Sequence, residues 1–213
     1  MKNNFKVLKN VVSKETQYFS CRYLYLKRQV LKTFREINYI SPYSKEWGSF
    51  GDSQVKDVYC CYGDLLMEVL LVELIPVLQK QIKKEVFPTY SYLRIYEKGS
   101  ILPKHIDRIS CEFSTTLNLG GDEWPIFLED KGKTHKVILK PGDMLVYKGN
   151  LLKHWRNKFK GDVCYQVFFH YNFLEKDSSK NNLYDTRKHL GLPSDLAQEI
   201  NINAHRKGEK NDS

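Results

Sequence analysis

The chain has 213 residues, 41% of them hydrophobic and 28% charged, and a formal net charge of +9. This composition is typical of a globular protein of one domain and excludes a disordered one. The most apolar run, residues 65–78, holds two glutamates and a proline and is too short to cross a bilayer, and the first ten residues lack the apolar core of a secretory signal, so we expect a cytoplasmic protein without a membrane partner.

The positive charge is spread along the chain. Its densest stretches are residues 79–84, 131–140 and 153–160. A basic surface attracts anionic partners such as nucleic acids. Because the chain has no basic tail, and because a solvated charged face is the commoner meaning of such stretches, the charge alone does not predict a nucleic-acid partner.

The first helix is predicted by a cap and by a stripe of apolar residues. Residues 5–12 are typical of a strand, and Ser13, with Glu15 two positions later, indicates where a helix begins. Apolar residues then recur at steps of three and four, which is helical periodicity. We expect the buried stripe of this helix to consist of Phe19, Tyr23, Leu26, Val30, Phe34 and Ile37.

A loop and a second helix follow. Residues 38–56 contain glycines, serines and a proline, and are expected to form a surface connection, with a loop that covers a site as the alternative. Residues 64–84 predict a second helix, bent at Pro76 because proline interrupts the helical hydrogen bonds.

The second half of the chain is typical of short strands separated by turns. The extended segments are residues 111–119, 126–129, 134–139 and 144–147, the last of which follows the turn sequence PGD. Such a series predicts a mainly β fold of the double-sheet jelly-roll kind. In a further strand, residues 163–173, one alternating set is wholly apolar or aromatic. The other set should line the interior, and it consists of Cys164, Gln166, Phe168, His170 and Asn172.

Three residues predict a metal site. His105 and Asp107 lie two positions apart, so that on an extended strand both side chains point the same way. His154 comes later, and the intervening strands can fold back to bring it beside the first pair. Two imidazoles and one carboxylate are the ligands that hold a non-heme ferrous ion and leave its opposite positions open. A His-x-Asp pair alone is a weak signal, so the surrounding sequence matters.

That surrounding sequence contains four ordered blocks, YSYLRIYEKGSILPKHIDR, CEFSTTLNLGGDEWPIFLE, KPGDMLVYKGNLLKHWR and YQVFFHYNF. They resemble the iron(II)- and 2-oxoglutarate-dependent oxygenases, and most closely the small bacterial and bacteriophage members of the prolyl 4-hydroxylase-like group. The resemblance implies a cupin-like double-stranded β-helix over residues 88–173, with one sheet buttressed by two helices from residues 1–87. Residues 1–173 then form a single oxygenase domain, and residues 174–213 form a polar, partly mobile extension.

The resemblance also implies cofactors and their ligands. Fe(II) would be held by His105, Asp107 and His154, with 2-oxoglutarate as cosubstrate, dioxygen (O2) as oxidant and ascorbate as a stimulant. Relatives place Tyr96 and Thr116 against 2-oxoglutarate, although both residues are also ordinary in strands. Gln166 and His170 form either a satisfied buried pair or a contact to the cosubstrate.

The sequence leaves open which basic residue anchors the distal carboxylate of 2-oxoglutarate. Relatives carry a basic residue about ten positions after the second histidine, where this chain has Cys164. Arg156 points to the same side as His154 by strand alternation and is our first candidate, because an arginine can bind a carboxylate through two hydrogen bonds. Its alternative role is a surface arginine packed on Trp155. Arg108 and Lys148 are the competing anchors.

The function implied is a dioxygenase that hydroxylates an unactivated carbon. The substrate is a protein or peptide, with peptidyl proline as the family-level expectation, or a small molecule. Nucleic-acid demethylation with the same cofactors is an alternative. A metal-binding jelly roll that serves as a non-catalytic interaction module is another, because fold does not determine function.

Overall fold

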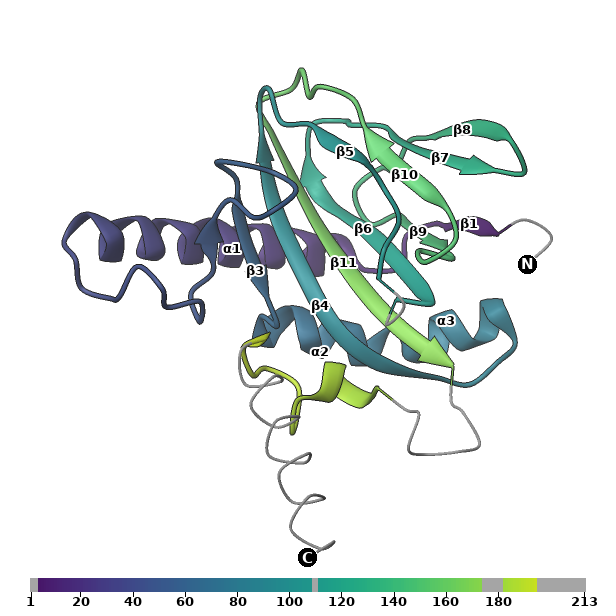
Figure 1. The fold of residues 1–213 in the computed structure, drawn as a ribbon, viewed down its shortest axis with the longest axis horizontal. Coiled ribbons are helices and arrows are strands. Elements are labelled where there is room, and N and C mark those ends of the chain that lie inside the picture. Colours follow the sequence, from purple (N-terminus) through teal and green to yellow (C-terminus); the bar gives the residue numbers. More distant parts are fainter. Residues whose placement is uncertain (1–3, 109–110, 174–181, 195–213) are drawn as a thin grey trace, which may run out of the picture.

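The computed structural model describes residues 4–108, 111–173 and 182–194. Two antiparallel sheets form a jelly roll (Figure 1). The larger sheet has the order β1-β9-β6-β11-β4-β3-β2, and the smaller has the order β5-β10-β7-β8. The strands of the larger sheet are β1 (Phe5–Leu8), β2 (Ser49–Phe50), β3 (Tyr59–Tyr62), β4 (Val86–Glu97), β6 (Phe113–Gly121), β9 (Met144–Tyr147) and β11 (Val163–Phe173). Those of the smaller sheet are β5 (Leu102–His105), β7 (Ile126–Asp130), β8 (Lys133–Val137) and β10 (Lys153–Arg156).

The mainly β fold with flanking helices that the sequence predicts is confirmed, with one difference in the helices. The helices are α1 (Lys14–Glu36), α2 (Leu65–Glu73) and α3 (Ile75–Ile82), and a 3₁₀ turn, η2, spans Leu183–Thr186. The second expected helix is therefore two helices that meet at Leu74. Pro76 lies in the first turn of α3, where its missing N–H costs nothing, so the chain starts a new helix there instead of bending one.

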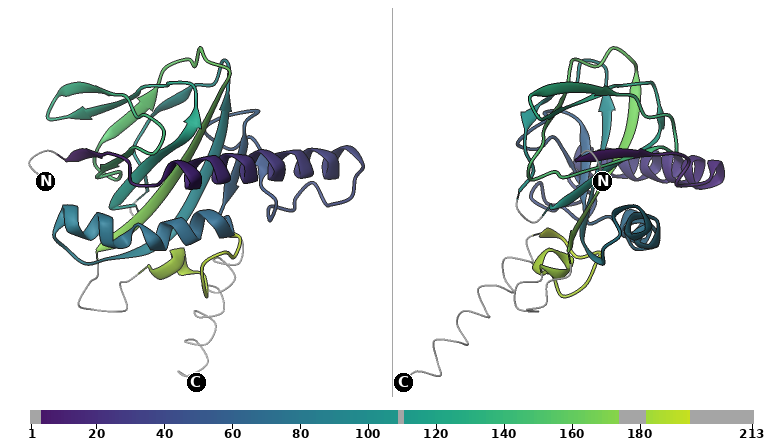
Figure 2. Two further views of the ribbon diagram at one scale, coloured as in Figure 1. Left: turned by 180° about the vertical axis from the view of Figure 1, so that it is seen from behind. Right: turned by 90° about the vertical axis from the view of Figure 1, so that its right-hand side faces the viewer.

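All three helices lie on the outer side of the larger sheet (Figure 2). Ser13 caps α1 by accepting a hydrogen bond from the backbone N–H of Thr16, as expected. The expected buried stripe is wrong, because Phe19, Leu26 and Ile37 are 60 to 62% exposed. The buried residues of α1 are Ser20, Leu24 and Leu31. Apolar residues occupy two adjacent faces of this helix, and only contact with the sheet decides which face is buried.

Strand β11 separates the helical layer from the interior of the jelly roll. Its apolar set packs on the helices, with Val167, Phe169 and Tyr171 in the same cluster as Met67 and Leu71 of α2. The opposite set faces the interior, as the alternation predicts, and Cys164, Gln166, Phe168 and His170 are all buried there. The long pairings of β11 with β4 and β6 bring this polar set beside the smaller sheet.

Within the described residues, no helix is long and apolar enough to span a membrane.

Two further segments meet the edges of the jelly roll. Residues 38–56 form a connection that contains the short strand β2 and reaches the mouth of the interior. Part of the C-terminal extension, residues 182–194, packs against the body through Asp185 and Arg187. The rest of that extension lies outside the described residues.

Candidate metal centre

The three predicted metal ligands converge on one point at the inner face of the smaller sheet. His105 ends β5, Asp107 follows it, and His154 lies on the neighbouring strand β10 directly opposite His105. The Nε2 atoms of His105 and His154 lie 3.6 Å and 3.5 Å from Oδ1 of Asp107. One ligand atom from each residue lies within 4.8 Å of the other two, which is close enough for all three to share one metal ion.

Hydrogen bonds to the backbone orient both imidazoles. Nδ1 of His105 lies 2.8 Å from the carbonyl oxygen of Pro103, and Nδ1 of His154 lies 2.9 Å from that of Leu152. A carbonyl oxygen only accepts, so each Nδ1 carries a proton and donates it. In the neutral ring this leaves the lone pair of Nε2 directed at Asp107. The two Nε2 atoms and Oδ1 of Asp107 are then all acceptors, and such a set needs a proton or a cation between its members. It therefore fits a divalent metal ion, which would take the place of the proton.

The carboxylate of Asp107 is held from the opposite side. Ser114 Oγ donates a hydrogen bond to Oδ2, and the backbone N–H of Asp107 donates to the carbonyl of Gly149 at 2.9 Å. Burial by itself raises the pKa of Asp107, but the hydrogen bonds that His105 and His154 donate when their Nε2 atoms carry a proton, together with the charge of His154, outweigh it and hold this pKa well below its usual range. The group is therefore an anion and presents Oδ1 to the metal position.

Gly149 is required beside this carboxylate, and its replacement by alanine is expected to damage the metal centre. A Cβ there would lie 2.2 Å from Asp107 Oδ2 and 2.1 Å from Ser114 Oγ. Displacing groups that orient a ligand weakens metal affinity by about 10- to 100-fold. Titration of the Gly149→Ala protein with Ni(II) checks this. Gly120→Ala, whose Cβ would meet only Cys21 Sγ on the helical side of the sheet, is the control and should bind metal normally.

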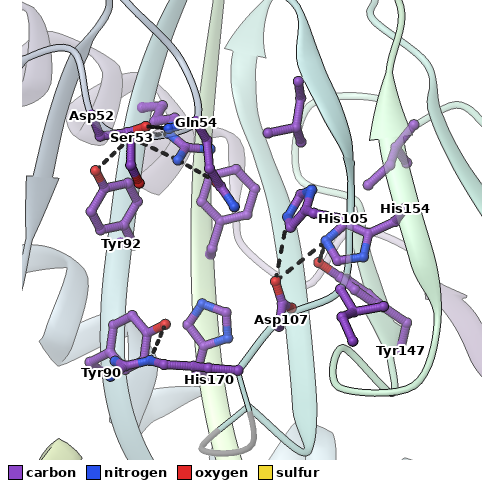
Figure 3. A pocket seen from close by; sticks show the side chains of 16 residues that line it. Asp52, Ser53, Gln54, Tyr90, Tyr92, His105, Asp107, Tyr147, His154 and His170 are labelled. Atoms are coloured by element: carbon purple, nitrogen blue, oxygen red, sulfur yellow. Dashed lines mark hydrogen bonds and ion pairs between the residues drawn. The ribbon is translucent and has the colours of Figure 1, made fainter.

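A cavity of about 340 Å³ opens in front of the three ligands (Figure 3). The metal ligands form one wall, and β4, β11 and the turn at residues 52–54 form the other. Residues 38–56 are thus more than a surface connection, because three of them border the cavity. The lining residues are Asp52, Ser53, Gln54, Tyr90, Tyr92, Arg94, Leu102, His105, Ile106, Asp107, Arg108, Ile126, Tyr147, His154, Phe168 and His170.

His170 and Arg108, two of the predicted cosubstrate contacts, lie together in this lining. Ser114 donates to Asp107, so it accepts from Nδ1 of His170 at 3.1 Å, and Nε2 of His170 is left without a proton. Burial lowers the pKa of His170 to about 4, so its ring is neutral at pH 7. The guanidinium of Arg108 lies over Tyr90 at 4.5 Å and forms an ion pair with Asp185 of the C-terminal segment.

Arg156, Gln166, Thr116 and Tyr96 form a buried polar cluster behind the cavity wall. Gln166 Oε1 accepts from Thr116 Oγ1 and from Arg156 Nη2, each at 3.1 Å. Arg156 also donates to the carbonyl of Trp124 and lies over its ring at 5.0 Å. The Tyr96 ring meets the same indole edge to face at 4.7 Å.

Arg156 is a buried cation that has no counterion in the part of the chain that the structure describes. Its side chain is 1% exposed, and among the described residues no carboxylate forms an ion pair with it and its Nε has no hydrogen-bond partner. Burial accordingly lowers its pKa. A buried charge without a partner is costly, so this guanidinium fits a carboxylate ligand. The alternative of a surface arginine packed on Trp155 does not match this burial.

Lys148 is the predicted anchor that the structure sets apart. It follows β9, its backbone N–H donates to the carbonyl of Asn4 at 3.0 Å, and it belongs neither to the cavity lining nor to the hydrogen-bonded cluster around Gln166. Sequence reasoning missed Ser114 and Arg94. Each lies two positions before a residue that the sequence did single out, Thr116 and Tyr96, so strand alternation was the signal that could have found them.

No protein-family model and no curated protein matches the sequence. Solved structures do resemble it. A prolyl-4-hydroxylase from Pseudomonas putida is 11% identical with a TM-score of 0.53, and the match covers 81% of this chain and 94% of that one. AviO1 from Streptomyces viridochromogenes Tue57 is 15% identical, with a TM-score of 0.59 and coverage of 79% and 89%. HygX from Streptomyces hygroscopicus, solved with nickel, 2-oxoglutarate and hygromycin B bound, is 12% identical, with a TM-score of 0.55 and coverage of 80% and 83%.

These similarities show the fold. The chain has the double-stranded β-helix of the 2-oxoglutarate-dependent oxygenases, as the four sequence blocks imply, and it carries a His-Asp-His group that fits a metal ion.

Proposed function

We propose that the protein is an Fe(II)- and 2-oxoglutarate-dependent dioxygenase that hydroxylates an unactivated carbon. The observation that carries this proposal is the convergence of His105, Asp107 and His154 within 4.8 Å at the wall of a cavity. Two neutral imidazoles and one carboxylate on one side of a metal leave the opposite positions open for cosubstrate and dioxygen. The fold, which recurs in HygX with nickel and 2-oxoglutarate bound, supports the same cofactors.

The roles of the residues follow from their contacts. His105 and His154 would hold the iron through Nε2, because their Nδ1 atoms are committed to backbone carbonyls. Asp107 would hold it through Oδ1, because Ser114 engages Oδ2. The iron, 2-oxoglutarate and dioxygen together supply the oxidation, and ascorbate would keep the iron ferrous. The protein contributes orientation and a cavity that shields the oxidant.

Arg156 is the proposed anchor of the distal carboxylate of 2-oxoglutarate. Its Nε is unsatisfied and its charge is unpaired within the described residues, whereas Arg108 is already paired with Asp185. Tyr96, Thr116 and Gln166 lie in the same cluster and would complete the polar surroundings of that carboxylate.

The substrate is proposed as a protein or peptide, with a peptidyl proline first, or a small molecule. The similar folds include a prolyl-4-hydroxylase and a protein solved with hygromycin B, which supports both classes. Nothing described in the cavity favours nucleic-acid demethylation over these. The cytoplasmic location and the limits of the oxygenase domain at residues 1–173 stay predictions.

Turnover of 2-oxoglutarate tests the proposal. With ferrous iron and ascorbate, the wild type is expected to form succinate slowly even without its prime substrate, and His105→Ala is expected to reduce this to background because one of three ligands is lost. His189→Ala removes an exposed histidine outside the site and should leave the rate unchanged. Metal uptake without succinate formation or 2-oxoglutarate binding would instead identify a non-catalytic metal-binding module.

A further inference from the structure

Part of the cavity wall that faces the metal ligands is a tight turn at residues 52–54 (Figure 3). Oδ1 of Asp52 accepts hydrogen bonds from the backbone N–H groups of Gln54 and Val55, both at 2.8 Å. These bonds lie within the turn itself. Attachment of the turn to the jelly roll depends on side chains, including Val55 and Val58, which are buried in a cluster around Tyr96 and Trp124.

Arg94 of β4 is the polar attachment of this turn. Its Nε and Nη2 donate to Oδ2 of Asp52 at 2.8 Å and 2.7 Å, and Nη2 also lies 2.8 Å from Oε1 of Gln54. Tyr92 donates to the same carboxylate oxygen at 2.7 Å. Burial by itself raises the pKa of Asp52, but Arg94 and these donors outweigh it, so that the pKa is lowered and the ion pair persists. One guanidinium therefore holds two side chains of the cavity wall.

The other end of Arg94 reaches the cluster assigned to the cosubstrate. Its Nη1 donates to the hydroxyl oxygen of Tyr96 at 3.1 Å. That oxygen accepts, so the hydroxyl hydrogen of Tyr96 is free to be donated, and within the described residues no acceptor takes it. Tyr96 is fully buried and shares Trp124 as a neighbour with Arg156. A carboxylate bound by Arg156 would be an acceptor for this hydroxyl.

We propose that Arg94 is a positioning residue that couples the bound cosubstrate to the cavity wall at residues 52–54. The inference rests on the proposed binding of 2-oxoglutarate. When Tyr96 donates to the cosubstrate, its oxygen becomes a better acceptor for Arg94, because hydrogen bonds in a chain polarise one another. The firmer placement of Arg94 then orders Asp52 and Gln54. Ser53 and Gln54 face the metal ligands across the cavity, so the ordered turn would shape the space in front of the metal.

The test uses the full chain loaded with Ni(II), with 2-oxoglutarate as the probe. Calorimetry measures 2-oxoglutarate binding, and mass spectrometry measures hydrogen exchange of the amides at residues 51–58. In the wild type, saturating 2-oxoglutarate is expected to slow exchange there by about tenfold, because opening of the turn becomes less favourable. Arg94→Lys keeps the charge but cannot bridge three partners, so exchange should be fast with and without 2-oxoglutarate.

If bound 2-oxoglutarate stabilises the turn at residues 52–54, an intact turn must in return strengthen the binding of 2-oxoglutarate. Arg94→Lys and Asp52→Asn should each weaken 2-oxoglutarate binding by about tenfold, because coupling between two sites is reciprocal. Arg28→Lys is the matched control. Arg28 lies on α1 and pairs with Glu97, which is on the same strand as Arg94 but outside the cavity. This variant should therefore behave as the wild type.

Three outcomes decide the matter. Unchanged exchange at residues 51–58 in wild type saturated with 2-oxoglutarate would overturn the coupling. The coupling would also be overturned if 2-oxoglutarate slowed exchange at residues 51–58 in both Arg94→Lys and Asp52→Asn as much as in the wild type. Failure of the wild type to bind 2-oxoglutarate would instead refute the proposed function, and the inference with it, and the calorimetry reports that separately from exchange.

Discussion

Arg156→Met is expected to remove most of the affinity for 2-oxoglutarate while metal affinity stays unchanged. Arg156 is 1% exposed and its guanidinium has no carboxylate partner among the described residues, so a bound carboxylate would be its counterion. Loss of one member of a buried, hydrogen-bonded charge pair costs about 2–5 kcal/mol of binding free energy. This corresponds to a rise in Kd of about 30-fold to several thousand-fold. Calorimetry with the Ni(II)-loaded protein measures it.

The competing anchors provide the controls for this prediction. Arg108→Met and Lys148→Met are expected to change the Kd for 2-oxoglutarate by much less, since Arg108 is paired with Asp185 and Lys148 belongs neither to the cavity lining nor to the cluster around Gln166. A normal Kd in Arg156→Met, together with a large rise in one of these two variants, would transfer the role of anchor to that residue. Thermal unfolding gives a second readout, because a ligand at 100 times its Kd stabilises the native state by about 2.7 kcal/mol.

Arg187→Ala is expected to lower the free energy of unfolding by about 3–5 kcal/mol, the cost of leaving one charge of a buried pair alone. Nη2 of Arg187 lies 2.7 Å from Oε1 of Glu68 on α2, and their side chains are 0% and 2% exposed. Arg187 also donates to the carbonyls of Thr89 and Leu192, at 3.1 Å and 2.6 Å. It thus ties the C-terminal segment to both a helix and the larger sheet. Urea unfolding followed by fluorescence measures the change.

A double variant separates the pair from the packing around it. Arg187→Met combined with Glu68→Met removes both charges, and such replacements are often neutral or stabilising, so it should recover part of the lost stability. Recovery should be incomplete, because the carbonyls of Thr89 and Leu192 and the N–H groups of Ser91 and Gly191 still lose their partners. Arg28→Ala breaks a partly exposed ion pair with Glu97 and should cost at most about 1 kcal/mol. A loss of less than about 1 kcal/mol in Arg187→Ala would show that the C-terminal segment does not hold the fold together.

Local patterns in the sequence predicted much of the jelly roll. The bounds of β9 and β11 agree with the expected segments, because turn residues and strict alternation mark them. The cap at Ser13 was also local and is confirmed. The face of α1 could not be predicted, because its apolar residues lie on two sides and the sheet that selects between them is far along the chain.

Donor chemistry and spacing on a strand, together with the resemblance of the four surrounding blocks, allowed the sequence to name His105, Asp107 and His154, and strand alternation made Arg156 the first candidate anchor. Only the tertiary structure decided that these ligands converge, that Arg156 is buried without a counterion among the described residues, and which residues complete the cavity. The ion pairs that hold the cavity lining join residues far apart in the sequence. Arg94 and Asp52 are 42 residues apart, and Arg108 and Asp185 are 77 residues apart. Periodicity describes neighbours on one element, whereas such contacts exist only once distant segments have packed together.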